Sequence, residues 1–319
     1  MGGRVASTPA ALVCRQLVKV FEGTRAVDGL DLSVPGGAIF GLLGPNGSGK
    51  TTTIRTSLGI YKPDGGSVEI LSSRDPLAVR HRTGYLPEER GLYAKMKVRE
   101  QLAFLASIRG LSLAESDRRA GAWLDRVGLA PRAQSLTREL SKGMQQKVQF
   151  AAAVIHDPEL VVLDEPFSGL DPVNSRLLKE LILEQRARGT TVILSTHRME
   201  EVESLCEFIC LLHHGRPVLN GRMRDIKAEY GRNTIAVEYG GPAGRLDGIP
   251  GVQACDDGGR HARLRLEAGV DAQRVMRAIL DRVEVDSVRL DEPHIEDIYL
   301  EKVGASKTHA APAPQETGA

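Results

Sequence analysis

The chain has 319 residues, which predicts about two domains at roughly 100 to 200 residues each. Hydrophobic residues make up 41% and charged residues 26% of it, as in ordinary globular proteins, and 42 basic against 41 acidic residues leave a formal charge of +1. This balance argues against a general nucleic-acid binder, because neutralising phosphates needs an excess of basic residues. No apolar run approaches the ~18 to 20 residues that cross a bilayer, and the first residues lack the apolar core of a signal peptide, so we expect a soluble or peripheral chain.

The cysteine pattern argues against a disulfide framework and against a thiolate metal site. The four cysteines show neither paired spacing nor a CxxC motif, which is typical of a reducing, cytosolic compartment. They are Cys14, Cys206, Cys210 and Cys255. We expect Cys206 and Cys210 on a helix that continues from His197, with Cys210 in the core.

The first part of the chain predicts β structure, then a strand, a glycine-rich loop and a helix. Residues 12–34 alternate in hydrophobicity and are broken by two acidic-glycine pairs, which predicts a small antiparallel sheet. The apolar run 38–43 predicts a strand that leads into the sequence GPNGSGKTTT. Residues 54–60 then have helical spacing.

The middle of the chain alternates helices with buried strands. Residues 98–128 predict a mostly helical insertion with a break near its middle, and Ser141 suits the N-cap of a further helix. The apolar runs in 159–166 and 190–197 lack alternation, as strands covered on both faces do, and a helix over 173–188 lies between them. Strands and helices in this order predict an α/β architecture with a parallel central sheet.

The last third of the chain changes character after a turn-rich hairpin at 214–223. Strand-like runs beyond it, with a helix before the last strand, predict a small α+β domain. A short helix is predicted from Pro293, because proline suits a first helical turn. From about residue 305 the chain has almost nothing to bury, which predicts a disordered tail.

The sequence GPNGSGKT at 44–51 matches the phosphate-binding pattern G-x-x-x-x-G-K-[ST] between a predicted strand and a predicted helix. Its glycines let backbone N–H groups approach a β-phosphate, and the helix directs its positive end at the anion. Lys50 is expected to reach the β- and γ-phosphates, and the Thr51 hydroxyl to bind Mg²⁺. The flanking elements disfavour the alternative of a chance match in a glycine-rich turn. The candidate nucleotide-binding residues are Gly44, Pro45, Asn46, Gly47, Ser48, Gly49, Lys50, Thr51 and Thr52.

Two carboxylates follow the buried strand in VVLDEP, at the strand end where open α/β sheets expose their ligands. Asp164 is expected to hold Mg²⁺, directly or through water, and Glu165 to polarise the attacking water as general base. Alone, an Asp-Glu pair here is more often an ordinary exit from the strand. The phosphate-binding loop upstream favours the catalytic interpretation.

The sequence LSKGMQQK (140–147) lies between these motifs, and SGLD (168–171) and STH (195–197) follow them. This ordered set resembles the ATP-binding subunits of ABC transporters. The resemblance implies a P-loop NTPase fold of the ABC type, with a parallel central sheet, an N-terminal antiparallel β subdomain and a helical subdomain. It divides the chain into an N-terminal extension (1–11), an ABC-type ATP-binding domain (12–222, helical subdomain about 96–157), a small α+β accessory domain (223–304) and a tail (305–319).

The resemblance also assigns roles outside the phosphate loop. Ser141 and Gly143 correspond to the signature motif, which caps the γ-phosphate of ATP bound to the opposite subunit. Asp171 is similar to the dimer-contacting aspartate, His197 to the switch histidine at the γ-phosphate, and Phe21 to the ring that stacks on adenine. Ser141 at a helix start offers an anion-binding terminus, useful only if the phosphate arrives from outside its own subunit. Taken singly, these residues would be an ordinary N-cap, a histidine at a strand end and a packed aromatic ring.

Three residues depart from the family pattern. The usual signature is LSGGQ, whereas Lys142 replaces one of its two glycines, Gly143 keeps the other, and Met144 replaces its glutamine. Glu88 stands after GYLP, where the family has a glutamine that binds Mg²⁺ and faces the membrane partner. A carboxylate is a competent ligand for a hard cation, so Glu88 joins Thr51 and Asp164 as a candidate Mg²⁺ ligand.

The sequence GYLPEERGLY, the altered signature and the C-terminal HIEDIYLEKV resemble the subfamily that serves ABC-2 type exporters of sodium or antibiotics. The resemblance implies a peripheral ATPase at the cytoplasmic face of the membrane, with ATP and Mg²⁺ as cofactors. It implies ATP sandwiched in a homodimer, or in a heterodimer with a paralogue, and a membrane permease on a separate chain. No nucleic-acid partner is expected.

Two alternatives stay open at this point. One is a non-transport ABC ATPase that acts on ribosomes or DNA, which the single phosphate loop and the short gap from Lys50 to Ser141 disfavour. The other is a regulatory subunit that binds ATP and hydrolyses it poorly. Intact Lys50, Asp164, Glu165 and His197 favour an active enzyme over it.

Overall fold

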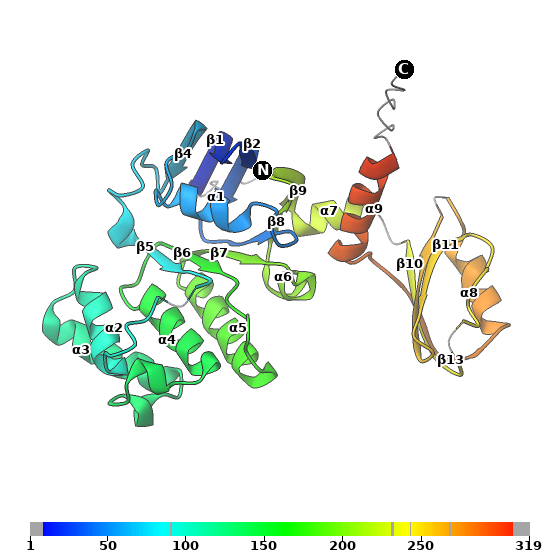
Figure 1. The fold of residues 1–319 in the computed structure, drawn as a ribbon. Coiled ribbons are helices and arrows are strands. Elements are labelled where there is room, and N and C mark those ends of the chain that lie inside the picture. Colours follow the sequence, from blue (N-terminus) through cyan, green and yellow to red (C-terminus); the bar gives the residue numbers. More distant parts are fainter. Residues whose placement is uncertain (1–8, 90, 231–232, 243, 268, 309–319) are drawn as a thin grey trace, which may run out of the picture. The chain divides into compact units, whose positions relative to one another are not determined.

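A computed structural model describes residues 9–89, 91–230, 233–242, 244–267 and 269–308 (Figure 1). The chain divides between Arg222 and Met223 into two compact units. The strands of the first unit are β1 (Ala10–Phe21), β2 (Thr24–Pro35), β3 (Ile39–Leu43), β4 (Gly65–Ile70), β5 (Thr83–Leu86), β6 (Leu160–Asp164), β7 (Thr191–Thr196), β8 (Phe208–His213) and β9 (Arg216–Arg222). Its helices are α1 (Lys50–Ser57), α2 (Val98–Ser107), α3 (Leu113–Arg126), α4 (Lys142–Val154), α5 (Pro172–Ala187) and α6 (Met199–Leu205), with short 3-10 helices at Arg80–Arg82, Ala130–Arg132 and Thr137–Glu139.

The N-terminal sheet is antiparallel, in the order β2-β1-β4. β1 and β2 form the predicted hairpin, closed where Glu22 and Gly23 take positive φ angles of 46° and 82°. The third strand, β4, was not predicted. Two of its six residues are glycines, which weakens the strand signal in the sequence.

The central sheet has the order β5-β6-β7-β3-β8-β9. Its first five strands are parallel, and β9 pairs antiparallel with β8 at the edge. All residues of β3, β6 and β7 are buried, as their continuous apolar runs predict. The predicted parallel α/β sheet is therefore confirmed, and the carboxyl ends of β3, β6 and β7 meet at one edge.

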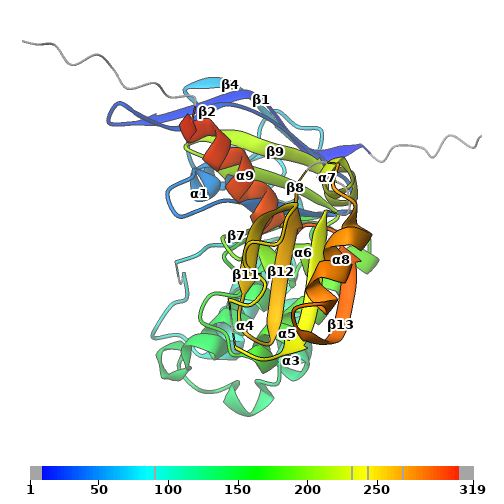
Figure 2. The ribbon, with the colours of Figure 1, turned by 90° about the vertical axis from the view of Figure 1, so that its right-hand side faces the viewer.

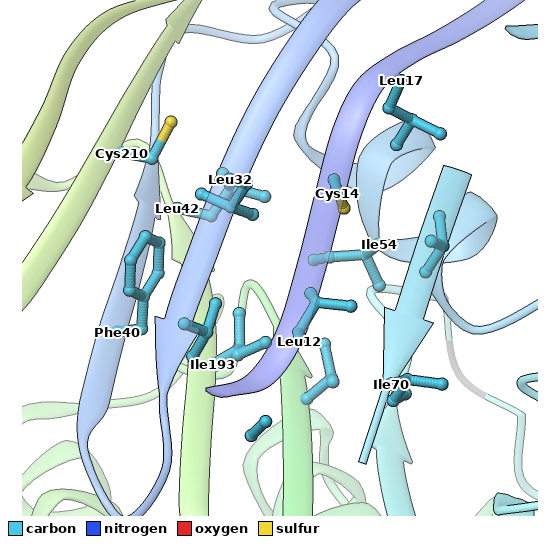
Figure 3. Close-up of a cluster of buried hydrophobic side chains, with 14 of the residues drawn as sticks. Leu12, Cys14, Leu17, Leu32, Phe40, Leu42, Ile54, Ile70, Ile193 and Cys210 are labelled. Carbon is cyan, nitrogen blue, oxygen red and sulfur yellow. The ribbon is translucent and has the colours of Figure 1, made fainter. Parts of the chain in front are cut away.

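One hydrophobic layer joins the two sheets of the first unit. Figure 3 shows Leu12 and Leu32 of the N-terminal sheet, Phe40 and Ile193 of the central sheet, and Ile54 of α1 in the same cluster. Helix α1 is thus held by burial on the inner side of the central sheet, while α4 and α5 cover its other face (Figure 1). This packing fixes the start of α1 beside the strand ends.

Two helix predictions need correction. Helix α1 begins at Lys50 and ends at Ser57, whereas helical spacing placed it at 54–60, because the phosphate-binding sequence itself forms the first turn. Cys206 and Cys210 do not share a helix: Cys206 caps the end of α6 and Cys210 lies in β8. Cys210 is fully buried, as predicted, and all four cysteines are free.

The second unit is the predicted α+β domain. It contains α7 (Met223–Tyr230), β10 (Thr234–Gly240), β11 (Val252–Asp257), β12 (His261–Leu266), α8 (Ala272–Leu280), β13 (Glu284–Asp291) and α9 (Ile295–Thr308). Its antiparallel sheet has the order β11-β12-β10-β13, and α8 packs on one face (Figure 2). Helix α7 was not predicted, and α9 runs past residue 305, where the tail was expected to begin. Residues 309–319 and 1–8, which complete the predicted tail and extension, lie outside the described residues.

Candidate functional site

The glycine-rich loop runs from the end of β3 to the start of α1, and two of its glycines lack both the backbone angle and the space for a side chain. Gly44 and Gly49 have φ angles of 144° and 104°. A Cβ atom at Gly49 would overlap the carbonyl oxygen of Ala26, and one at Gly44 that of Leu212. The loop therefore needs glycine both for its backbone angles and for the close approach of neighbouring backbone.

A cavity of about 390 Å³ lies on this loop. It is lined by Ala26, Asn46, Gly47, Ser48, Gly49, Lys50, Thr51, Thr52, Glu88 and Glu165. The Ser48 hydroxyl is buried and has no hydrogen-bond partner among the described residues. Because buried polar atoms are normally satisfied, an unpaired hydroxyl beside a cradle of backbone N–H groups indicates a site for an anionic ligand.

Lys50 lines the cavity and is 6% exposed. Its Nζ atom donates to the carbonyl oxygens of Gly44 at 2.8 Å and Pro45 at 3.2 Å, and lies 3.7 Å from Oε1 of Glu165. Burial lowers the pKa of Lys50, while the charges of Glu165 and Asp164 oppose that change. The loop thus holds the ammonium group where bound phosphates would lie.

Asp164 ends β6 and is fully buried. Its Oδ1 atom accepts hydrogen bonds from the hydroxyls of Thr51, at 3.3 Å, and Ser195, whereas its Oδ2 atom is buried without a partner among the described residues. Burial raises the pKa of Asp164, and the Ser195 and Thr51 hydrogen bonds oppose that change.

These residues fit a hard divalent cation. An unpaired carboxylate oxygen on Asp164, the Thr51 hydroxyl and the Glu88 carboxylate near the cavity are oxygen donors of the kind Mg²⁺ takes. No group of three or more His, Cys, Asp or Glu side chains in the described part of the chain could hold a metal ion. A cation here would therefore also need oxygens from a phosphate or water, as is usual for Mg²⁺.

Glu165 follows β6 in the left-handed region, with φ 49°. Its backbone N–H faces the carbonyl oxygen of Ser195 at 3.1 Å and the Ser195 hydroxyl at 3.2 Å. Its carboxylate lies 3.0 and 3.1 Å from Nδ1 of His197. With Nδ1–H donating to the carboxylate, Nε2 of His197 is left to contact a ligand, and the imidazole is half exposed.

The signature residues lie elsewhere on the first unit. Ser141 caps α4 and its Oγ accepts from the N–H of Met144 at 3.3 Å. Gly143 lies next to Leu170 and Asn174, beside Asp171, which caps α5. Ser141, Gly143 and Asp171 are absent from the residues that line the phosphate cavity. The predicted site residues therefore form two clusters in one copy of the chain. The first contains Lys50, Thr51, Asp164, Glu165 and His197, and the second contains Ser141, Gly143 and Asp171.

Phe21 belongs to neither cluster. It is 40% exposed at the end of β1, and its ring meets that of Tyr61 edge-on at 5.3 Å. Sequence reasoning gave no role to Ala26, whose carbonyl oxygen borders Gly49, or to the Ser195 hydroxyl. The one sequence signal that could have found it is the position of Ser195 two residues before His197.

Comparison with known proteins identifies the first unit. Residues 27–168 match the family described as ABC transporter, and residues 221–303 match the C-terminal domain of DrrA1-3-like ATP-binding proteins. A solved ATP-binding subunit of an ABC transporter superposes with a TM-score of 0.65 at 34% identity, over 69% of this chain and 93% of that one.

Relatives extend the match along the chain. The ABC transporter ATP-binding protein YhaQ of Bacillus subtilis is 40% identical over 92% of this chain and 99% of its own length. The daunorubicin/doxorubicin resistance ATP-binding protein DrrA of Streptomyces peucetius is 32% identical, over 90% of this chain and 91% of its own. Nod factor export ATP-binding protein I of Cupriavidus pinatubonensis is 40% identical over 76% of each chain.

No helix of the described residues is both long and apolar enough to cross a membrane.

The matches to the family model, to the relatives and to the solved structure confirm the predicted family and fold. The chain belongs to the ATP-binding proteins of ABC transporters, a family whose members hydrolyse ATP and work with membrane permeases.

Proposed function

We propose that this chain binds ATP with Mg²⁺ in the 390 Å³ cavity and hydrolyses it as one half of a site completed by a second ATP-binding subunit. The observation that carries the proposal is the separation of two clusters. Lys50, Asp164, Glu165 and His197 gather at the strand ends, while Ser141 lies at another helix start. One copy thus offers an incomplete set of donors to a γ-phosphate.

The residues at the cavity have different roles in phosphoryl transfer. The loop N–H groups and the Lys50 ammonium bind the phosphates. Thr51, Asp164 and Glu88 would hold Mg²⁺, which would neutralise phosphate charge. Glu165 accepts a proton from the attacking water as general base. His197 orients the Glu165 carboxylate through Nδ1 and presents Nε2 toward the γ-phosphate.

A second copy supplies the missing donors. Ser141 and the first N–H groups of α4 form an exposed positive helix end, which favours anions. Gly143 and Asp171 lie on the same surface, so Asp171 is placed to contact the opposite subunit. Phe21, which is exposed and does not line the cavity, is proposed to lie against adenine. The dimer is formed by two copies or by this chain and a paralogue.

Mixing two inactive variants tests the composite site. Lys50→Ala damages the phosphate loop, and Ser141→Arg blocks the signature helix, so each protein alone should lose ATPase activity. An equimolar mixture should recover about a quarter of the wild-type rate, because random pairing makes half of the dimers mixed and each holds one intact site of two. Released phosphate is measured at equal total protein.

The matched control mixes Lys50→Ala with Glu165→Gln. Both changes fall on the same side of the composite site, so every dimer in that mixture lacks an intact site and no activity should return. Recovery in the control, or no recovery with Ser141→Arg, would contradict the proposed arrangement.

We further infer that the permease partner belongs to an exporter and holds this chain at the cytoplasmic membrane face. Two relatives are named for drug resistance and for Nod factor export. A groove next to the segment after β5 supports a protein contact there. It holds about 130 Å³ and includes Leu92, Leu105 and Ile108, the last 60% exposed. The exposed rings of Tyr93 and Phe104, 5.9 Å apart, extend its apolar surface.

A charged substitution tests this surface. Ile108→Glu should abolish co-purification of the chain with a permease from detergent-solubilised membranes and leave the ATPase rate of the isolated protein unchanged. Leu183→Glu, at an exposed leucine on α5 (47%), is the control and should keep the permease. Retention by Ile108→Glu would refute this contact surface.

A further inference from the structure

Ser195 lies at the end of β7, directly beside Asp164 in the parallel sheet. The ladder between β6 and β7 pairs Asp164 with Ser195, and Ser195 is fully buried. Its hydroxyl therefore has no access to solvent. Its hydrogen bonds must be made inside the protein, where an unpaired polar group is costly.

The Ser195 hydroxyl links the two acidic residues that follow β6. It donates to Oδ1 of Asp164 and lies 3.2 Å from the backbone N–H of Glu165, from which it accepts. A hydroxyl has one hydrogen and two lone pairs, an ionised carboxylate only accepts and a backbone N–H only donates. The direction of both hydrogen bonds is thus fixed by the chemistry of the groups.

The first bond orients the Asp164 carboxylate. The Thr51 hydroxyl lies 3.3 Å from the same oxygen, Oδ1, so two hydroxyls, one from α1 and one from β7, donate to that atom. The other oxygen, Oδ2, stays buried without a partner in the described part of the chain. Ser195 and Thr51 together therefore select which Asp164 oxygen remains available to a cation.

The second bond orients Glu165. This residue has φ 49°, a left-handed conformation that non-glycine residues adopt only where surrounding contacts hold it. Its N–H is faced by two acceptors of Ser195, the carbonyl oxygen at 3.1 Å and the hydroxyl. This backbone turn directs the Glu165 side chain toward Lys50 and His197.

We propose that Ser195 is a positioning residue of the ATPase site. It orients the Asp164 carboxylate for binding of Mg²⁺, and it holds the Glu165 backbone in the conformation that directs the Glu165 carboxylate to the attacking water. The inference rests on the proposed function, because it assigns a role in the same site. Ser195 is absent from the residues that line the cavity, so we expect it to touch neither the nucleotide nor the attacking water. It acts through the two carboxylate residues, so its loss should show as a weaker effect of Mg²⁺ rather than as weaker binding of phosphate.

The test compares how strongly Mg²⁺ improves nucleotide binding in different variants. For the full chain, the dissociation constant of a fluorescent, non-hydrolysable ATP analogue is measured in EDTA and in Mg²⁺, and the ratio gives the Mg²⁺ effect. Ser195→Ala should lower this ratio on the order of tenfold, as expected for loss of a partner behind a metal ligand, with the EDTA value unchanged. Ser195→Thr keeps the hydroxyl and should stay within about threefold of wild type.

Thr191→Val is the matched control, because it also removes a buried hydroxyl from β7. Thr191 is 3% exposed and its Oγ1 atom accepts from the N–H of Gly37 at 2.9 Å, at the other end of the strand. Thr191→Val should leave the Mg²⁺ effect unchanged. If Ser195→Ala does not fold, Ser195→Cys, a weak donor of similar shape, should show the same loss.

Two results would overturn the role of Ser195. One is a Mg²⁺ effect in Ser195→Ala, or in Ser195→Cys if only that variant folds, within about twofold of wild type. The other is an equal loss in Thr191→Val, which would mark a general effect of weakening β7. A wild-type protein with no Mg²⁺ effect at all would instead refute the Mg²⁺ site itself, so the failure of the inference and of the proposed function are distinguishable.

Discussion

Glu165→Gln separates binding from turnover at the proposed site. The amide keeps the size of the side chain and one oxygen that can still accept from Nδ1 of His197, 3.0 Å away. It removes the carboxylate that accepts the proton of water. General-base catalysis contributes about 10² to 10⁴ in rate, or about 3 to 5 kcal/mol of activation free energy, so turnover should fall by that range. ATP binding should persist and the dimer should accumulate.

The assay is phosphate release at saturating ATP and Mg²⁺, together with gel filtration in the presence of ATP. Glu88→Gln is the control, because it makes the same chemical change at the other carboxylate that lines the cavity. It should keep at least about half of the wild-type rate, since an amide oxygen still binds a hard cation. A Glu165→Gln rate like that of wild type would refute the assigned base, and a loss of about tenfold or more in Glu88→Gln would show that its carboxylate itself is required.

Two further predictions concern the loop and the fold. Gly49→Ala should weaken ATP binding at least about tenfold more than Gly47→Ala. Both glycines have a positive φ, but only at Gly49 would the new Cβ overlap neighbouring backbone. Equilibrium binding of ATP measures the two losses, and equal losses would contradict the prediction. Burial, aided by the charge of Arg109, lowers the pKa of His156 from 6.5 to about 4. On acidification the unfolded chain therefore binds this proton at a higher pH than the folded state does. The stability that neutral His156 allows is present above pH 6.5 and is lost as the pH falls toward 4. Between pH 7.5 and pH 5, the unfolding free energy of wild type should fall by about 2 kcal/mol more than that of His156→Gln. Unfolding is followed by the fluorescence of the single tryptophan, Trp123. Parallel curves of unfolding free energy against pH would contradict this assignment.

The central sheet could be predicted because its signal is local. β3, β6 and β7 are buried on both faces, so their sequences are continuous apolar runs, and each is followed by a polar motif at the sheet edge. β4 and α7 escaped prediction for the opposite reason. β4 includes two glycines, and α7 buries only Met223 and Ile226, so neither sequence carries a strong pattern.

The sequence indicates which residues could form the candidate site, but not which of them contact one another. Spacing places Asp164 at the end of one strand and His197 after another, yet only the sheet order β6-β7-β3 brings Lys50 and His197 to the same carboxylate, Glu165. The role of the Ser195 hydroxyl depends on the β6 and β7 register, and a shift of one residue would turn it to the other face. Such long-range pairing leaves no trace in either segment alone.

The most direct test of the composite site is a structure of the Glu165→Gln protein with ATP and Mg²⁺. We predict a nucleotide whose β- and γ-phosphates lie on Lys50 of one subunit and whose γ-phosphate also contacts Ser141 and Gly143 of a second subunit. A γ-phosphate enclosed entirely by one copy of the chain, with Ser141 of every copy far from nucleotide, would contradict the account.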